Sequence, residues 1–376
     1  MIRLTVPSID EDDLKAVRDV LESGFLVQGP RVAEFEQSIA NYVGTTYAVA
    51  VSNCTAALHL SLLAIGVGPG DWVAVPTYSW PATVNVVVLS GAKPVFVDIE
   101  PDTFNMSPDA LETSLSSQQV KAVIPVHTFG GIADMKRINA IAAKYGAIVI
   151  EDAACAIGAS LAERAAGTWG TMGCFSFHPR KALTTGEGGM ITTNDPQLVR
   201  SMRALRNHGQ DPDAPKPDFI LPGYNLRLTE FQAALGLTQL QKLDRIIAKR
   251  QVLVHTYNSL LDGTELRPPT LLPESNHVYQ SYVVLLPGEI ASKRSEIIAD
   301  LKNRGVETTI GTYHLPMTRY FREQGGYKRG DFPVADDISE RSLTLPLYDG
   351  LTTADQELVI SELLEVLGTK SATVAI

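Results

Sequence analysis

The chain has 376 residues, of which 45% are hydrophobic and 20% are charged. This length and composition exclude a small disulfide-stapled module and a disordered polypeptide, and they favour two domains or one large domain with an appendage. The net charge of -10 argues against a general binding surface for nucleic acid. Three cysteines without metal-ligand spacing indicate a reducing, cytoplasmic setting and no metal site.

Membrane targeting is not indicated anywhere in the sequence. The N-terminal segment "MIRLTVPSIDEDDLKAV" lacks the basic and apolar regions of a signal peptide. No apolar run reaches the length of about 20 residues that a membrane-spanning helix needs. We therefore expect a soluble protein that does not associate with a membrane.

The first part of the chain alternates between helical and strand-like hydrophobic patterns. Helical spacing covers residues 12–23, 30–43, 55–66, 81–90 and 135–146, and strand-like runs cover residues 47–52, 72–76, 93–99, 121–127 and 147–152. Such alternation implies a mostly parallel sheet that helices cover on both faces. We therefore predict an α/β fold.

The pattern changes after residue 167. Strand-like runs at 173–178 and 188–194 flank a loop that contains Lys181, and they are close enough in the sequence to pair. A long helix at 229–261 leads to a second region, where we predict strands at 281–287 and 306–311 and helices at 292–305 and 353–368. We predict a large domain of residues 1–250, whose N-terminal segment can pack on a smaller C-terminal α+β domain of residues 251–376.

A turn after the strand at 47–52 has the chemistry of a phosphate site. Asn53, Cys54 and Thr55 lead into a helix whose first N–H groups and positive dipole end attract an anion, and Thr55 adds a hydroxyl. Capping of the helix by Asn53 or Thr55 explains the same residues equally simply. The turn alone leaves both alternatives open.

Two further strands end in residues that can meet a ligand. Glu151 and Asp152 close the strand at 147–152, and ligands of open parallel sheets lie beyond the carboxyl ends of strands. An acid there could hold a protonated heterocyclic nitrogen, or Asp152 could cap a following helix. Trp80 follows the strand at 72–76, and it either packs in the core or an interface or lies against an aromatic ligand.

Lys181 lies just before the glycine-rich segment "GEGG". A loop lysine is usually a solvated cation. Combined with a phosphate site, an acid for a ring nitrogen and an aromatic face, however, a loop lysine is what pyridoxal phosphate (PLP) requires for its Schiff base. The sequence lacks the GxGxxG, GxxxxGK[ST] and GxSxG motifs of dinucleotide-binding proteins, P-loop proteins and serine hydrolases.

Eight segments resemble, in the same order, the DegT/DnrJ/StrS family of sugar aminotransferases, which are PLP enzymes with the aspartate aminotransferase fold (fold type I). They include "LVQGPRVAEFEQSIANYVG", "EDAACAIGA", "FSFHPRKALTTGEGGMITTND" and "GYNLRLTEFQAALGLTQL". The resemblance covers nearly the whole chain. It implies a three-layer PLP domain with a mostly parallel mixed sheet and a smaller C-terminal domain.

The same resemblance assigns roles around the cofactor. Lys181 would form the Schiff base and then shuttle a proton between substrate and cofactor, and Asp152 would form a salt bridge with the pyridine nitrogen. Trp80 would stack on the ring. The phosphate would be held by Thr55, Ala56 and Ser176.

Other matching positions concern the substrate and the partner subunit. In "GYNLR", Asn225 would reach the phosphate of the neighbouring subunit's cofactor, so that a homodimer would share its active sites. Arg227, Tyr313 and His314 are candidates for substrate contacts. His178 would contact the ring or the substrate, although a packed histidine explains it as well.

The chain departs from the family pattern at two cofactor-binding positions. Cys155 stands where many members have a glutamine that approaches the PLP 3-oxygen, and a thiol forms weaker hydrogen bonds than an amide. Cys54 replaces the glycine that usually precedes Thr55. Both changes are compatible with the site, because the backbone N–H groups and Asp152 supply the main interactions.

The resemblance implies a cytoplasmic aminotransferase that uses PLP and its pyridoxamine phosphate (PMP) form. It would move an amino group from glutamate or glutamine to a keto-sugar nucleotide, a 4-keto-6-deoxyhexose, in the biosynthesis of a polysaccharide or an antibiotic. A lysine at position 181, where dehydratases of the family have histidine, favours transamination. A ketocyclitol aminotransferase, a PLP- or PMP-dependent sugar dehydratase and a non-catalytic cofactor-binding regulator remain as alternatives.

Overall fold

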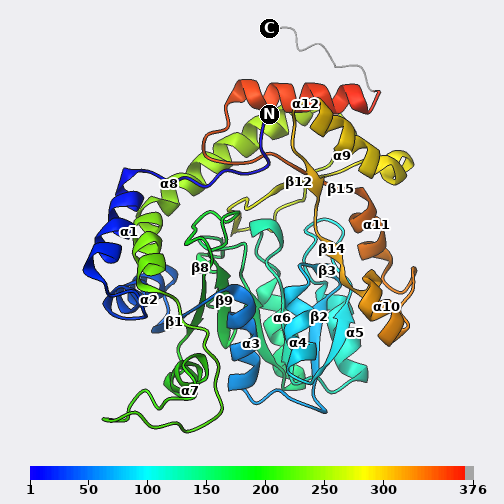
Figure 1. The fold of residues 1–376 in the computed structure, drawn as a ribbon. Helices are drawn as coiled ribbons and strands as arrows, with labels where there is room; N and C mark the ends of the chain where they lie inside the picture. Colours follow the sequence, from blue (N-terminus) through cyan, green and yellow to red (C-terminus); the bar gives the residue numbers. More distant parts are fainter. Residues whose placement is uncertain (369–376) are drawn as a thin grey trace.

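A seven-stranded sheet lies at the centre of the computed structural model, which describes residues 1–368 (Figure 1). Its strand order is β1-β10-β9-β6-β5-β2-β4, and only β10 runs antiparallel to its neighbours. The strands are β1 (Tyr47–Val51), β2 (Trp72–Pro76), β4 (Lys93–Val97), β5 (Ala122–Val123), β6 (Ile148–Asp152), β9 (Met172–Ser176) and β10 (Gly189–Thr193). The predicted α/β class with a mostly parallel mixed sheet is confirmed.

Helices cover both faces of this sheet and complete a three-layer arrangement. They are α2 (Pro30–Val43), α3 (Cys54–Ala64), α4 (Ala82–Leu89), α5 (Pro108–Ser117), α6 (Met135–Tyr145) and α7 (Pro196–Arg206). Along β1, Ala48 and Ala50 belong to the core beneath α2 and α6, whereas Val49 and Val51 belong to the core beneath α3 and α7. Because successive side chains of a strand point to opposite faces, both faces of the sheet are buried.

A long helix, α8 (Glu230–Leu261), connects the large sheet to the C-terminal region (Figure 1). It packs on α1 (Glu11–Ser23) and α2 near its start and on α12 (Thr353–Val366) near its end. The predicted boundary near residue 251 falls inside this continuous helix. That boundary therefore remains a prediction, and residues 369–376 lie outside the described part of the chain.

The C-terminal region has its own antiparallel sheet and core. The sheet order is β12-β15-β13, and its strands are β12 (Tyr282–Leu285), β13 (Thr309–Ile310) and β15 (Ser342–Leu345). The helices around it are α9 (Arg294–Asn303), α11 (Pro333–Arg341) and α12, with a 3-10 turn at η2 (Gly288–Lys293). The turn η3 (Leu315–Met317) and α10 (Arg319–Gly325) pack instead on the core of the large sheet. Ile2 pairs with Val306 and joins the core of the C-terminal sheet, so the N-terminal segment packs on the C-terminal region.

Several short elements differ from the sequence-based expectations. The strand expected at 121–127 is a regular strand only at Ala122–Val123, with a further isolated bridge from Val126 to Asp152. The one expected at 306–311 is regular only at Thr309–Ile310, with an isolated bridge from Val306 to Ile2. The pattern also gave no indication of five two-residue strands or of the 3-10 turn η1. These are β3 (Tyr78–Ser79), β7 (Ser160–Leu161), β8 (Arg164–Ala165), β11 (Ser275–Asn276), β14 (Tyr313–His314) and η1 (Thr128–Gly130). None of the helices within residues 1–368 is long and apolar enough to cross a membrane.

Candidate active site

The carboxyl ends of the central strands bring several predicted site residues to one edge of the sheet. Asp152 ends β6, Ser176 ends β9, and Asn53 follows β1 at the start of α3. Lys181 lies in the loop between β9 and β10, whose pairing places Gly189 opposite Ser176. In open α/β sheets, this edge is where ligands bind.

The Lys181 amine lies in direct contact with Cys155. Its Nζ is 3.0 Å from the Cys155 Sγ, and its backbone N–H donates to the carbonyl of His178 at 2.8 Å. Burial lowers the pKa of Lys181, but the neighbouring sulfur atoms and Asp152 outweigh that effect and raise the pKa above its usual range. The sequence predicted that Cys155 lies near Asp152, but it gave no indication of this contact with the lysine.

Asp152 is a buried carboxylate that neutral donors hold in place. Its Oδ2 accepts a hydrogen bond from the Thr83 hydroxyl at 2.8 Å, and its Oδ1 accepts one from the Ala154 N–H at 3.2 Å. Burial raises the pKa of Asp152, against these hydrogen bonds, which lower it. Residues 153–159 form turns, so the alternative that Asp152 caps a helix is wrong. Thr83 was missed, and its only signal was a hydroxyl within an apolar helix.

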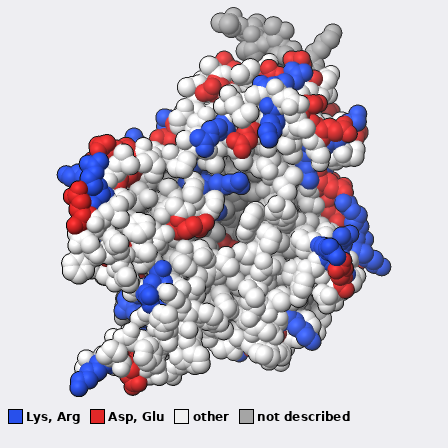
Figure 2. All heavy atoms as spheres, viewed as in Figure 1, with Lys and Arg blue, Asp and Glu red and all other residues white. Residues whose placement is uncertain are grey.

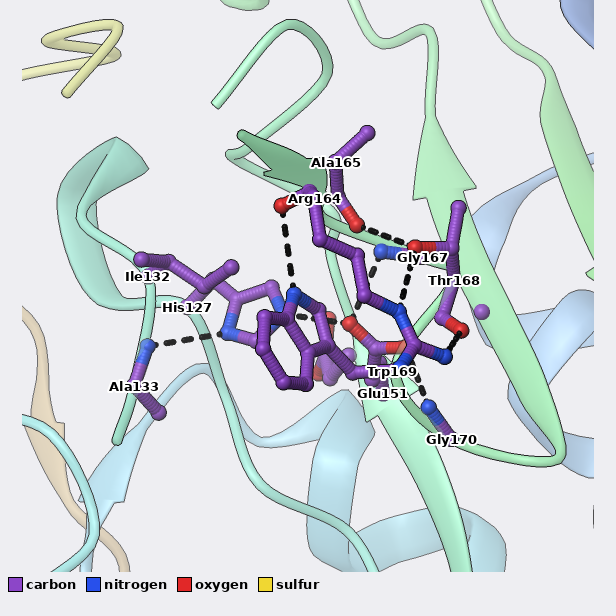
Figure 3. A network of polar contacts seen from close by, with 12 residues as sticks. His127, Ile132, Ala133, Glu151, Arg164, Ala165, Gly167, Thr168, Trp169 and Gly170 are labelled. Carbon is purple, nitrogen blue, oxygen red and sulfur yellow. Dashed lines mark hydrogen bonds and ion pairs between the residues drawn. The ribbon is translucent and has the colours of Figure 1, made fainter. Parts of the chain in front are cut away.

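Glu151, the neighbour of Asp152, points to the opposite face of the sheet, where it joins the polar network of Figure 3. Its carboxylate accepts hydrogen bonds from the His127 Nε2 at 2.8 Å and from the N–H groups of Gly167 and Gly170 at 2.8 and 2.7 Å. The Nδ1 of His127 accepts from the Ala133 N–H, so the ring proton resides on Nε2. This network ties β6 to the loop at 167–170, and it gives Glu151 a structural role.

The start of α3 is capped and still has the features of an anion site. Asn53 Oδ1 accepts from the Ala56 N–H at 2.8 Å, as the capping alternative predicted. The N–H groups of Cys54 and Thr55 belong to the first turn, which has no intrahelical acceptors, and Thr55 is exposed. Gly189 approaches this turn so closely that a Cβ on it would lie 2.5 Å from the Asn53 carbonyl.

Trp80 lies at the surface, so it does not pack in the core, while packing in an interface stays open. Its side chain is 62% exposed, and its ring contacts Tyr313 edge-on with the centroids 5.5 Å apart. The contact arises because β14 pairs with β3, so that Tyr313 lies opposite Ser79 (Figure 1). The structure thus brings the predicted substrate residue Tyr313 next to the predicted ring-stacking residue Trp80.

The residues on either side of the Lys181 loop are connected to one another. Ser176 Oγ accepts from the His178 N–H at 3.4 Å, and the His178 Nδ1 accepts from the Arg180 N–H at 3.2 Å. Burial lowers the pKa of His178, while Glu187, at 3.9 Å, opposes the change. His178 is half-buried at the edge of the site, so its contact with the ring or substrate stays a prediction.

Three predicted residues have other neighbours. His314 is buried, with its Nδ1 3.3 Å from Asp336 Oδ1 on α11, on the side of β14 opposite to Tyr313. Asn225 is exposed and forms an isolated antiparallel β-bridge with Asn207. The side-chain oxygen of Asn207 accepts a hydrogen bond from the guanidinium of Arg227. Within residues 1–368, no direct polar contact joins Asn225 or Arg227 to Lys181.

The residues at this edge fit PLP. Because the hydrogen bonds to the buried Asp152 carboxylate come from neutral donors, a cationic ring nitrogen would supply a fitting charge partner. The start of α3 suits a phosphate, and Lys181 supplies an amine within the same loop cluster. The face drawn in Figure 2 is hollowed between its upper and lower parts, with basic and acidic side chains at the border of the hollow.

A mostly parallel seven-stranded sheet with a lysine and a buried acid at its ligand-binding edge is the architecture of the PLP-dependent enzymes of fold type I. Residues 7–364 match the DegT/DnrJ/EryC1/StrS aminotransferase family, and the chain belongs to that family. It is therefore a PLP-dependent aminotransferase, as the resemblance implied.

Known relatives extend over the whole length of the chain. An uncharacterized protein of Methanocaldococcus jannaschii is 36% identical over 360 residues, which are 93% of each chain. A sugar aminotransferase of Streptococcus pneumoniae in its PMP form is similar with a TM-score of 0.93 and 28% identity, over 97% of this chain and 99% of that one. Helicobacter pylori PseC, an aminotransferase of pseudoaminic acid biosynthesis, gives a TM-score of 0.92 and 26% identity over 98% and 99%. Both solved structures are named as aminotransferases, in agreement with the family match.

Proposed function

We propose that this enzyme transfers an amino group from glutamate or glutamine to a keto-sugar nucleotide, a 4-keto-6-deoxyhexose, in the cytoplasm. The observation that carries the proposal is the lysine amine at 3.0 Å from Cys155, beside the buried Asp152, in a family whose solved members include sugar aminotransferases. Lysine at this position favours transamination over the dehydratase alternative. Biosynthesis of a polysaccharide or an antibiotic would use such an amino sugar.

PLP, when bound, supplies an electron sink that makes a proton on the adjacent substrate carbon acidic. Lys181 would take up that proton as a neutral amine and return it to the cofactor, at the other end of the conjugated system. The buried carboxylate of Asp152 would hold the ring nitrogen in its charged form, and Trp80 would cover one face of the ring. Thr55, Ser176 and the start of α3 would hold the phosphate.

The substrate would enter beside the aromatic pair of Trp80 and Tyr313. This pair is partly exposed, as a surface that meets a sugar must be, and it lies at the separate two-stranded sheet of β3 and β14. His314 would act indirectly, because it packs behind Tyr313 against Asp336. Asn225 and Arg227 would serve the site of a partner subunit in a homodimer.

A substrate panel tests this proposal. Nucleotide-linked 3-keto and 4-keto sugars and a ketocyclitol are incubated with glutamate or glutamine, and amino products are detected by mass. We expect the 4-keto-6-deoxyhexose nucleotide to give the fastest turnover and the Lys181→Ala variant to give none. Turnover of the ketocyclitol alone would overturn the sugar assignment, and product formation by the Lys181→Ala variant would overturn the role of the lysine.

A further inference from the structure

The side chain of Gln280 binds the backbone on both sides of Lys181. Its Nε2 donates to the carbonyl of Arg180, and its Oε1 accepts from the N–H of Ala182 at 3.1 Å. These two groups belong to the two peptide bonds that flank the lysine. Gln280 is buried, so both hydrogen bonds are shielded from water.

A buried arginine holds the backbone of Gln280. Arg250, from α8, donates through its Nη1 to the carbonyls of Tyr279 and Gln280 at 3.0 and 3.2 Å. Only 3% of Arg250 is exposed, and burial lowers its pKa to about 10. Removing a guanidinium from water has a large free-energy cost, and two carbonyl groups offset only part of it. The position of Arg250 is therefore one that the fold maintains against this cost.

The backbone around Gln280 is also strained. Tyr279 has a φ of 47°, in the left-handed region that bulky residues rarely adopt, and Phe129 beside it has a φ of 56°. Between them, Gly130 approaches so closely that a Cβ on it would lie 2.8 Å from the Gln280 nitrogen. Strain of this kind persists where the surrounding structure fixes a functional group. The packing around Tyr279, Phe129 and Gly130 thus fixes the backbone position of Gln280.

We propose that Gln280 is a positioning residue that holds the main chain of Lys181 while the lysine side chain moves. The inference rests on the proposed aminotransferase function, in which Lys181 is at one stage bound to the cofactor and at another free to carry a proton. A four-carbon side chain reaches both positions reproducibly only if its Cα stays fixed, and small misplacements of a reacting group slow a reaction strongly. Gln280 thus connects the C-terminal region to the amine.

The decisive variants are Gln280→Ala and, as a matched control, Gln251→Ala. Gln251 binds the same segment through Asn276 and the carbonyl of His277, but it does not contact the lysine loop. We expect Gln280→Ala to weaken PLP binding about tenfold and to shift the pH midpoint of the absorbance of bound PLP, because two buried hydrogen bonds are lost. We also expect kcat to fall more than KM rises. The control should keep the wild-type affinity, midpoint and kcat.

Hydrogen exchange provides a readout that does not involve the reaction. In the wild-type apo protein the Ala182 amide should exchange slowly, and in Gln280→Ala it should exchange at least tenfold faster, while the Gln251→Ala control stays protected. If Gln280→Ala does not fold, Gln280→Glu replaces it; it keeps the acceptor for Ala182 but loses the donor to Arg180, and it should give an intermediate shift of the pH midpoint.

Two outcomes would overturn the role of Gln280. One is a folded Gln280→Ala protein with the wild-type PLP affinity and pH midpoint, and the other is an Ala182 amide that exchanges freely in the wild type. Neither measurement uses a sugar substrate. Failure of the substrate panel would therefore contradict the proposed function and leave this test intact.

Discussion

At the scale of single residues, the pair of Lys181 and Cys155 distinguishes this site from relatives with glutamine at the cysteine position. A thiol can become negatively charged, whereas an amide cannot. The sulfur atom lies 3.0 Å from the amine and helps to raise its pKa. The exchange of glutamine for cysteine therefore changes the pH at which the Lys181 amine becomes neutral. It would also change the contact that this position makes to the cofactor.

Replacing Cys155 by serine should allow Lys181 to react with PLP at lower pH. A hydroxyl is not charged in this pH range, so the ammonium form of Lys181 loses part of its stabilisation and its pKa falls. Because attachment requires the neutral amine, the profile of PLP uptake against pH should move down by roughly 0.5 to 1 pH unit. The rate is followed by absorbance after PLP is added to the apo protein.

The control for this experiment is Cys174→Ser. Cys174 is buried, and its Sγ lies 3.4 Å from the Ser61 Oγ. It has no direct contact with Lys181, so its replacement should leave the pH profile unchanged. Superimposable profiles of the wild type and Cys155→Ser would show that the sulfur does not influence the amine.

At the scale of elements, the site depends on how closely β10 approaches the start of α3. Gly189 begins β10, and a methyl group on it would lie 2.5 Å from the Asn53 carbonyl and 2.8 Å from the Cys54 nitrogen. These are backbone atoms, so the clash cannot be relieved by rotating a side chain. A larger residue must separate the strand from α3, whose first N–H groups would hold the phosphate in the site that we propose.

The variant Gly189→Ala should therefore bind PLP at least tenfold more weakly, because the displaced start of α3 no longer points its N–H groups at the phosphate. Fluorescence titration of the apo protein with PLP measures this affinity, and a melting curve checks the fold. Gly288→Ala is the control, because a Cβ there meets no atom within 4 Å. Equal affinities of the two variants would contradict this account of the phosphate site.

The elements that the sequence predicted are those in which a helical or strand-like hydrophobic pattern extends over many residues. α8 and the strand β1 follow from such patterns, and the β9–β10 pair follows from the spacing of its two apolar runs. β3 and β14 have two residues each, which is too short for any period to be recognised. Their pairing depends on tertiary contacts, such as the bond from the Tyr78 hydroxyl to Ser342.

At the scale of the whole molecule, the sequence predicted single residues of the site better than their partners. The strand end at Asp152 and the lysine loop are local features, so they could be located from their neighbours along the chain. Gln280 lies about 100 positions from the residues it binds, and Arg250 reaches its backbone from α8. Contacts over such separations leave no local pattern, so only the fold reveals them.

Two loops expose several large apolar side chains to solvent. The loops flank the ends of α1 and α7, and the side chains are Phe25, Leu26, Val27, Phe219, Ile220 and Tyr224. The second loop leads directly to Asn225, which has no direct polar contact with the Lys181 site within residues 1–368. In the homodimer that we propose, a second copy of the chain would cover these side chains and bring Asn225 to the cofactor of its partner.

Replacing Phe219, which is 62% exposed, by glutamate should therefore produce a monomer that binds PLP weakly. A charge buried in an apolar interface is unfavourable by several kcal/mol, and without the partner each site would lack Asn225. Sedimentation velocity gives the mass, and titration with PLP gives the affinity. Leu89→Glu is the control, because Leu89 is exposed to 69% on α4, away from both loops. If Phe219→Glu stays dimeric, or becomes monomeric with undiminished PLP affinity, Asn225 does not complete the partner's site.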